Sequence, residues 1–283
     1  WDYGKGGYND DDIEEGFLAS LEQEINFFDT AEVYGMGRSE TLLGQFLKNH
    51  PAPVVVATKF FPFPFRLSKG ALLRALKSSL QRLGLPCVDL YQIHQPIPPR
   101  SPEHWAEALA EAYQMGLVKA VGVSNYSADW MRRADDTLAR QGIPLASNQV
   151  EYSLFNRHVE HNGVQKACQE RNITLIAYSP LAKGMLSGKY SVKNPPPSAR
   201  RAIYGKYLAE ITRLVEVLRE VGEAHGGKQP AQVALRWLME KGAVPIPGIK
   251  NAAQARSNAG ALGWKLSMEE VAKLDAASSK INR

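Results

Sequence analysis

Cysteine is scarce in this chain, and long apolar runs are missing. Cys87 and Cys168 have no paired spacing, so we expect reduced thiols and a cytosol-like compartment. No apolar run approaches the roughly 18 residues that a bilayer-spanning helix needs, and we expect no membrane partner. The opening WDYGKGGYNDDDI shows no secretory signal. We therefore expect a cytoplasmic protein, or an organellar stroma protein if a targeting segment once preceded Trp1.

The chain also lacks a large excess of either positive or negative charge. The 34 Lys and Arg residues and 29 Asp and Glu residues leave a net charge of +5, and the basic residues are scattered. Nucleic-acid-binding proteins gather such residues into patches, so we expect no nucleic-acid partner; we also expect no metal site. Hydrophobic content of 44% and charged content of 22% are typical of a globular protein. The 283 residues fit one α/β barrel domain, residues 1–283.

Strand-like apolar runs recur along the chain, each followed by a helical pattern, as repeated βα units require. The predicted strands are Ile25–Asp29, Val54–Lys59, Val88–His94, Lys119–Ser124, Ala146–Val150, Ile173–Tyr178 and Ala243–Pro247. An eight-stranded parallel barrel needs one more strand, which we expect to precede Trp1. The alternative is an open seven-stranded sheet, which would leave two parallel edges exposed.

The helical patterns also have readable ends. Ser39 is a plausible N-cap for a helix over Ser39–Lys48, and the spacing predicts one continuous helix over Val159–Arg171. The regularity lapses between Ser179 and Tyr204, where the chain contains Pro195-Pro196-Pro197. Connections of this length are usually functional or disordered.

Polar side chains stand at the C-terminal ends of six consecutive predicted strands. They are Asp29, Lys59, His94, Ser124-Asn125, Gln149 and Tyr178-Ser179. Singly, each has a structural explanation, such as a capping aspartate, a surface lysine or a core histidine. Barrel strands all end on the face where barrel enzymes work, so six such ends favour a shared site.

Six motifs together resemble the aldo-keto reductase superfamily, in its order and over nearly the whole chain. They are DTAEVYG at Asp29–Gly35, ATK at Ala57–Lys59, VDLYQIH at Val88–His94, VGVSNYS at Val121–Ser127, AYSPLAKGMLSGKY at Ala177–Tyr190 and IPGIKNAAQARSNAGA at Ile246–Ala261. The resemblance implies a (β/α)8 TIM barrel that lacks its first strand here, and NADPH-dependent reduction of aldehydes and ketones. Gly248-Ile249-Lys250-Asn251 favours the branch with long cofactor-covering loops.

The resemblance also implies four catalytic residues. Tyr34 would be the general acid that protonates the carbonyl oxygen. A free phenol has a pKa near ~10 and is a poor acid at neutral pH, but a nearby cation lowers such a pKa. Lys59 would supply that cation, Asp29 would hold Lys59 charged, and His94 would orient the substrate oxygen.

The cofactor site carries over in the same way. Ser124, Asn125 and Gln149 resemble the residues that bind the nicotinamide amide, and Tyr178 the ring that stacks on it. The predicted pyrophosphate loop comprises Ser179, Pro180, Leu181, Gly184 and Lys189, with Arg200 or its neighbour Arg201 near the phosphates. The predicted adenosine site comprises Gly248, Ile249, Lys250, Gln254, Ser257 and Asn258. Lys250 lies just before a helix N-terminus and favours a 2′-phosphate, hence NADPH over NADH; a solvated lysine is the alternative.

Trp1, Phe60, Phe61 and Phe63 would make the substrate pocket apolar, suited to aromatic or aliphatic aldehydes. The partner expected is thus a small carbonyl compound. One alternative function is a regulatory protein resembling potassium-channel β-subunits, which keep the fold and cofactor with little turnover. Another is that a chain lacking a strand does not fold stably alone.

Overall fold

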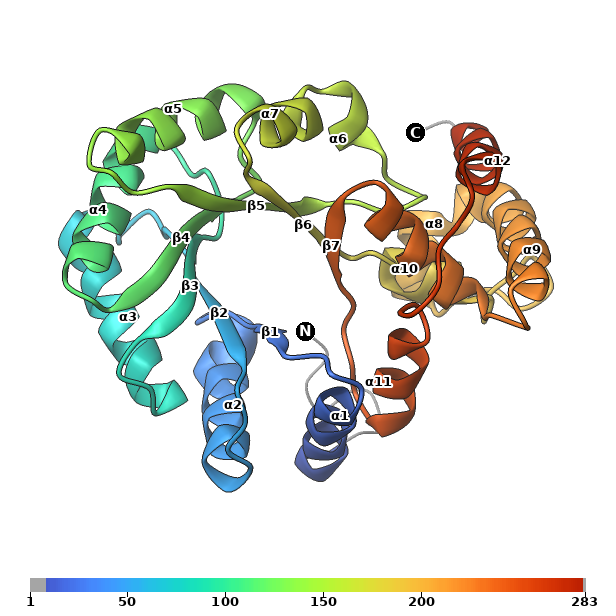
Figure 1. Ribbon diagram of the computed structural model, residues 1–283, viewed down its shortest axis with the longest axis horizontal. Coiled ribbons are helices and arrows are strands. Elements are labelled where there is room, and N and C mark those ends of the chain that lie inside the picture. The colour runs from blue at the N-terminus through green and yellow to red at the C-terminus, as the bar shows by residue number, and fades with distance from the viewer. Residues whose placement is uncertain (1–8, 282–283) are drawn as a thin grey trace. The chain divides into compact units, whose positions relative to one another are not determined.

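Figure 1 shows the computed structural model, which describes residues 9–281. Its strands β1 to β7 are hydrogen-bonded to one another in chain order. The chain divides into two compact units. The described part of unit 1 comprises residues 9–150, 162–175 and 250–252, and that of unit 2 comprises residues 151–161, 176–249 and 253–281.

Unit 1 alternates strands with helices. Its strands are β1 (Phe27–Asp29), β2 (Val55–Phe60), β3 (Val88–Ile93), β4 (Val118–Ser124), most of β5 (Leu145–Glu151) and the start of β6 (Thr174–Tyr178). Its helices are α1 (Asp10–Glu22), α2 (Arg38–Asn49), α3 (Lys69–Leu83), α4 (Pro102–Gln114), α5 (Ala128–Ala139) and α7 (Val164–Glu170), with a short 3-10 segment η1 (Tyr34–Gly37). Strands β1 to β5 pair in parallel.

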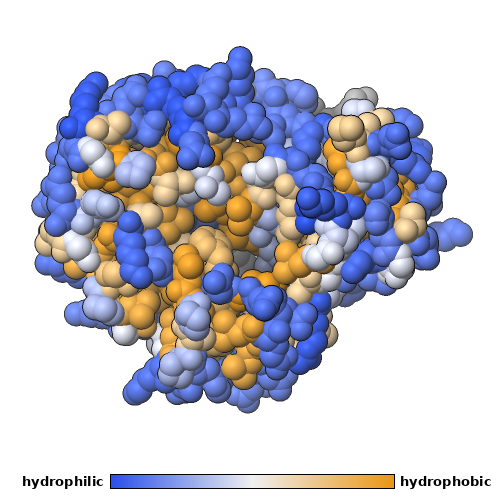
Figure 2. Space-filling view, viewed as in Figure 1, coloured by the Kyte–Doolittle hydropathy of each residue, from blue (hydrophilic) through white to orange (hydrophobic). Residues whose placement is uncertain are grey.

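The α3 helix illustrates how local sequence sets an element. Ser68 caps it by accepting a hydrogen bond from the Ala71 amide, and Gly84 ends it in the left-handed conformation, which glycine adopts without strain. Leu72 and Leu76, one turn apart, are fully buried. Figure 2 shows hydrophobic side chains gathered over the strands of unit 1, with hydrophilic ones over the surrounding helices.

Side chains of β2 alternate between the two faces of the sheet, and this alternation separates core packing from polar chemistry. Thr58 donates to Glu40 of α2 (2.5 Å), and Phe60 packs on Trp105 of α4 with ring centroids 5.3 Å apart. Lys59 lies between them in sequence and therefore points to the opposite face. The face of the sheet that packs against the helices is thus filled by the core, and the Lys59 side chain lies on the opposite face.

Unit 2 contains the rest of β6, β7 (Ala243–Ile246) and most of the C-terminal helices. Its helices are α6 (His158–His161), α8 (Ser198–Tyr204), α9 (Leu208–Ala224), α10 (Pro230–Glu240), α11 (Ala252–Ala259) and α12 (Met268–Ser279), with 3-10 segments η2 (Ala182–Ser187) and η3 (Gly205–Tyr207). Trp237 of α10 donates to Asp275 of α12 (2.9 Å), which joins these helices through a partly buried hydrogen bond. Within residues 9–281, no helix has both the length and the apolar character to cross a membrane.

Several element predictions are corrected by the structure. The helix predicted over Val159–Arg171 is two helices, α6 and α7, because Gly163 adopts a φ of 83° between them. The connection from Ser179 to Tyr204 is not irregular throughout, since η2 and α8 lie within it. The first strand is also shorter than predicted and begins at Phe27.

Gly122 of β4 marks a register shift in the pairing with β5, between Val121 and Gly122. A Cβ at this position would lie 2.3 Å from Ser147 Oγ and 3.2 Å from the Ser147 carbonyl oxygen. Only glycine therefore allows β4 and β5 to approach this closely without displacing Ser147.

We predict that Gly122→Ala lowers the free energy of unfolding by about 1–3 kcal/mol, because the added methyl group overpacks this contact. Gly70→Ala on α3 is the matched control, since its Cβ would meet only the flexible end of Arg74 at 3.4 Å. That variant is expected to be neutral or more stable by up to about 1 kcal/mol. Urea unfolding measures both, and equal stabilities for the two variants would contradict the close approach.

Candidate active site

A buried ion pair forms the centre of the site in unit 1. Lys59 Nζ donates to Asp29 Oδ2 (2.5 Å) and to the carbonyl oxygen of Thr30 (2.7 Å). The Lys59 side chain is fully buried, and that of Asp29 is 9% exposed. Burial lowers the pKa of Lys59, while the Asp29 carboxylate opposes that shift and favours the charged ammonium. The pair therefore places a cation inside the fold, in direct contact with a carboxylate.

Tyr34 lies beside this cation. Lys59 Nζ is 5.1 Å from the centroid of the Tyr34 ring, a distance at which an ammonium and an aromatic ring attract. Tyr34 opens η1, and the next residues, Gly35 and Met36, have φ values of 57° and 56°. This left-handed turn follows Tyr34 directly and leads into α2, which begins at Arg38. The loop of the DTAEVYG motif thus brings phenol, ammonium and carboxylate together.

His94 completes the group. Its ring meets the Tyr34 ring edge-on, with centroids 5.6 Å apart. Its Nδ1 is buried and has no hydrogen-bond partner among the described residues. Burial, and then the Lys59 charge, lower the pKa of His94 to about 4, so the imidazole is neutral at neutral pH. A neutral imidazole carries one N–H donor, which suits it to orient a polar oxygen.

The residues predicted to bind the nicotinamide amide lie beside this group. Ser124 Oγ donates to the Gln149 carbonyl oxygen (2.8 Å), and Asn125 Nδ2 donates to the His94 carbonyl oxygen (3.2 Å). Gln149 Nε2 donates to Asp29 Oδ1 (2.8 Å). Asn125 has a φ of 61°, a left-handed conformation that is uncommon outside glycine. Polar ends of β4 and β5 are therefore connected to the ion pair.

The predicted stacking and pyrophosphate residues lie in unit 2. Burial raises the pKa of Tyr178, so its hydroxyl stays protonated at neutral pH. Ser179 has a φ of 50°, and its carbonyl oxygen accepts from the Ala182 amide (2.9 Å). Pro180 is buried, and Leu181 accepts from the Gly184 amide (2.9 Å). These residues form one tight turn that enters η2.

Two predicted phosphate ligands converge on Tyr190. Arg200 Nη1 donates to the Tyr190 hydroxyl (2.9 Å), and Lys189 Nζ lies 5.7 Å from the Tyr190 ring centroid. Arg201, the alternative to Arg200, is exposed. Two cations on one aromatic ring give unit 2 a local positive charge.

The predicted adenosine residues are divided between the units. Gly248 and Ile249 belong to unit 2, and Lys250 belongs to unit 1 and lies two residues before α11. Gln254, Ser257 and Asn258 are on α11, at a spacing that places them on one helix face.

Of the residues predicted to contact the substrate, one lies beside His94, one is buried in the core and one is outside the described residues. Trp1 lies outside the described residues. Phe61 packs edge-on against His94, with centroids 5.5 Å apart. Phe60 has no exposed area and packs on Trp105, with Arg66 above its ring at 4.9 Å. Its ring fills the helix-facing core, because Lys59 already occupies the opposite face, and we do not retain it as a substrate contact.

Gln92 and Glu32 belong to this region and were not singled out from the sequence. Gln92 is fully buried, and its amide lies 3.5 Å from Asp29 Oδ1. The sequence contained a signal for Gln92, because Gln92 stands two residues before His94 in the predicted strand Val88–His94, and alternation places both on one face. Glu32 accepts from the Phe61 amide (2.8 Å) and from Arg66 (3.0 Å). No local pattern identifies those partners, which are distant in sequence.

The lowered pKa of His94 predicts a pH dependence of stability. Between pH 6.5 and the folded-state pKa of about 4, the unfolded chain binds more protons at this histidine than the folded chain does. Stability therefore falls as the pH falls through this window, by up to about 3 kcal/mol from this group. Urea unfolding of wild type and His94→Asn at pH 7 and pH 4.5 measures it.

The wild type should lose about 2–3 kcal/mol more than His94→Asn between those pH values. The exposed His158 provides the control, and His158→Asn should follow the wild type. A stability difference between wild type and His94→Asn that is the same at both pH values would contradict the burial of a neutral imidazole.

Comparison with known proteins identifies the family. The model of the Aldo/keto reductase family matches residues 1–279. A chloroplastic pyridoxal reductase of Arabidopsis thaliana is 40% identical over 285 residues, which cover 96% of this chain and 78% of that protein. The Schizosaccharomyces pombe protein "Aldo-keto reductase yakc [NADP(+)]" is 32% identical over 264 residues, covering 85% of this chain and 75% of that protein.

Solved structures of similar proteins point to the same family. A thermostable aldo-keto reductase in complex with the inhibitor epalrestat aligns with a TM-score of 0.80 and 30% identity, covering 98% of this chain and 89% of that one. A glycerol dehydrogenase from Gluconobacter oxydans aligns with a TM-score of 0.87 and 27% identity, covering 98% and 88%. With the ordered strands and helices, these likenesses confirm the predicted (β/α)8 fold class. The chain therefore belongs to the aldo/keto reductase family of oxidoreductases, which use nicotinamide cofactors.

Proposed function

We propose that this protein reduces aldehydes or ketones to alcohols with NADPH, using Tyr34 as the general acid. The observation that carries the proposal is the position of the Lys59 ammonium, bonded to Asp29 on one side and 5.1 Å from the Tyr34 ring centroid on the other. A phenol next to a buried cation is a stronger acid than a free phenol.

The reaction needs a hydride and a proton. A bound nicotinamide would supply the hydride to the carbonyl carbon, and the carbonyl oxygen then gains negative charge. Tyr34 donates its phenolic proton to that oxygen, which completes the alcohol. The phenolate left on Tyr34 is stabilised by the Lys59 ammonium until a proton returns from solvent.

His94 has a separate task in this proposal. It is neutral and buried, and its ring lies edge-on to Tyr34. A neutral N–H donor holds the carbonyl oxygen near the phenol without competing for the proton that Tyr34 delivers. His94 therefore positions the substrate, and Tyr34 transfers the proton.

The residues present fit a phosphorylated nicotinamide cofactor. Ser124, Asn125 and Gln149 supply polar groups next to the catalytic residues, and Tyr178 supplies a half-buried ring. Lys189 and Arg200 supply positive charge for phosphates. Lys250 would select NADPH by binding the 2′-phosphate, and the S. pombe relative is named for NADP(+).

Phe61 and Phe63 favour a flat, aromatic carbonyl substrate. Phe61 contacts His94, and Phe63 contacts Phe61 with ring centroids 4.5 Å apart. An aromatic aldehyde could stack along these rings. The Arabidopsis relative is named a pyridoxal reductase, and pyridoxal is a planar heteroaromatic aldehyde, so we place it first among candidate substrates. The name of that relative also favours an organellar stroma over the cytoplasm.

Tyr34→Phe removes the proton donor and keeps the ring. We expect kcat with pyridoxal or benzaldehyde to fall by about 10²–10⁴-fold, with the Kd for NADPH within a few-fold of wild type. Tyr113→Phe is the matched control, because Tyr113 is on the exposed side of α4. NADPH oxidation and fluorescence titration measure the two quantities, and wild-type turnover in Tyr34→Phe would refute the assignment. Tight NADPH binding without turnover in the wild type would instead favour the regulatory-protein alternative.

Lys250→Met tests the choice of cofactor. We expect the Kd for NADPH to rise about tenfold or more, because a charge-assisted contact to the 2′-phosphate is lost, while the Kd for NADH stays nearly constant. Lys280→Met removes the same charge from an exposed position after α12 and should change neither value. An equal loss of affinity for both cofactors in Lys250→Met would contradict a role in 2′-phosphate recognition.

A further inference from the structure

Unit 1 contains a cavity of about 370 Å³ on the helix side of the sheet, outside the candidate active site. Its walls come from three places: Glu32 after β1, the loop that follows β2, and α3. Tyr34, Lys59 and His94 are not among the residues that line this cavity. The volume falls within the range of small-molecule sites in proteins.

The shape of the cavity follows from the side chains of α3. Ala71 and Ala75 are one turn apart on this helix, and both line the cavity. Short side chains at these positions leave room that longer ones would fill. Arg74 and Arg82 line the same space from α3, and Arg66 lines it from the preceding loop.

The lining carries an excess of positive charge. Among residues 9–281, three arginines and one carboxylate line the cavity; the carboxylate is that of Glu32, which pairs with Arg66 at 3.0 Å. Arg82 pairs with the fully buried Glu40 at 2.6 Å. Arg74 has no ion pair and no side-chain hydrogen bond among residues 9–281, and it is exposed. One cation of the three is thus left without a counter-charge within the described chain.

Some hydrogen-bond donors of the cavity lining are not used in contacts among the described residues. A guanidinium has five N–H donors, and the contacts of Arg66 with described residues use only its Nη2. Those of Arg82 use Nε and Nη2. Ser68 accepts from the Ala71 amide through its oxygen, which leaves its own hydroxyl proton available. Guanidinium and hydroxyl donors around one space are the set that recognises a multiply charged oxyanion.

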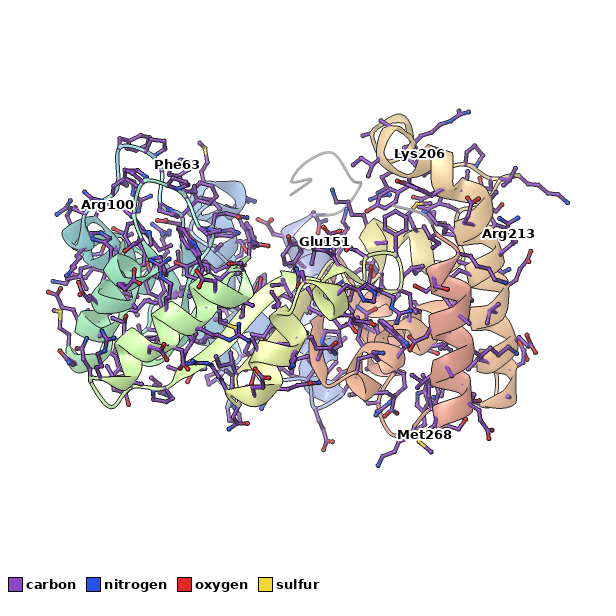
Figure 3. All side chains as sticks on the ribbon, turned by 90° about the horizontal axis from the view of Figure 1, so that it is seen from above. Phe63, Arg100, Glu151, Lys206, Arg213 and Met268 are labelled. Carbon is purple, nitrogen blue, oxygen red and sulfur yellow. The ribbon has the colours of Figure 1, made fainter. Side chains whose placement is uncertain are left out.

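The rim of the cavity is aromatic. Phe65 lines it, and its side chain is 82% exposed. Its ring stacks on that of Phe63, with an interplanar angle of 6° and centroids 5.5 Å apart. Figure 3 labels Phe63 on the loop that follows β2. An exposed ring held in place beside a cationic pocket can pack against the organic part of a ligand.

We propose that this cavity is a second ligand site, and that it binds a small aromatic phosphate monoester. The arginines and Ser68 would bind the phosphate, with Arg74 as its main counter-charge, and Phe65 would pack on the aromatic group. A carboxylate fits less well, because it carries one charge and two oxygens where the cavity offers donors from three guanidinium groups.

Phenyl phosphate is the probe for the test, and binding is measured by titration calorimetry at constant ionic strength. Arg74→Gln should weaken binding by about 10–100-fold, because one charge-assisted contact is lost. The fold should persist in this variant, since the Arg74 side chain has no polar partner in the described chain. Lys77→Gln is the matched control: it removes the same charge from an exposed position of α3 that does not line the cavity.

A second arm separates this cavity from the proposed cofactor site. Phenyl phosphate binding should be unchanged in Lys250→Gln, and should persist in the presence of saturating NADP⁺. Loss of binding in either case would assign the phosphate to the cofactor site and overturn the proposal. So would an undetectable affinity in the wild type, or equal affinities in wild type and Arg74→Gln. None of these measurements depends on turnover, so failure of the proposed reductase activity would leave this test intact.

A third arm tests the aromatic part. Inorganic phosphate should bind more weakly than phenyl phosphate, and Phe65→Ala should remove most of that difference. Equal affinity for the two probes in the wild type would mean that the cavity recognises a bare oxyanion, and the monoester assignment would be wrong.

Discussion

The ion pair between Lys59 and Asp29 is the interaction on which the rest of unit 1 depends. An ammonium with no solvent exposure is stable only if other groups replace its water, and here a carboxylate and the Thr30 carbonyl oxygen do so. Removing one partner of such a pair typically costs about 3–5 kcal/mol, since the other charge is left buried and unpaired. The pair also fixes register: Asp29 lies opposite Ala57, and Lys59 lies two residues further on the same face of β2.

The second carboxylate oxygen of Asp29 extends this constraint to other strands. Oδ1 accepts from Gln149 of β5 at 2.8 Å, and Gln92 of β3 lies 3.5 Å away. Ser147 of β5 in turn donates to Gln92 at 3.4 Å, in the space that Gly122 leaves open. Polar side chains from three other strands, β2, β3 and β5, therefore gather around the Asp29 carboxylate of β1. A change at any of them alters the support of the Lys59 ammonium, which links the packing of the sheet to the acidity of the phenol.

Much of this group could be predicted from the sequence, because strand ends and side-chain alternation are local properties. Asp29, Lys59 and His94 each end an apolar run, and parallel strands bring such ends together. Phe60 shows the limit of counting aromatics near a site: with Lys59 on one face, its neighbour must point to the other. The break at Gly163 was not predicted, since a glycine within a helical pattern costs only about 1 kcal/mol and is often tolerated. The arginine-lined cavity could not be predicted, because Glu32, Arg66 and Arg82 meet only after folding.

Glu32 connects that cavity with the candidate active site. It stands two residues before Tyr34, and one of its oxygens accepts from the Phe61 amide while the other accepts from Arg66. The Phe61 ring lies against His94, and Arg66 lies over Phe60 at 4.9 Å. An anion that draws the Arg66 guanidinium towards itself would weaken its bond to Glu32, and the position of the Phe61 amide depends on that carboxylate. The cavity and the candidate active site therefore share one carboxylate, which bonds through one oxygen to a residue of the cavity wall and through the other to the backbone of Phe61 beside His94.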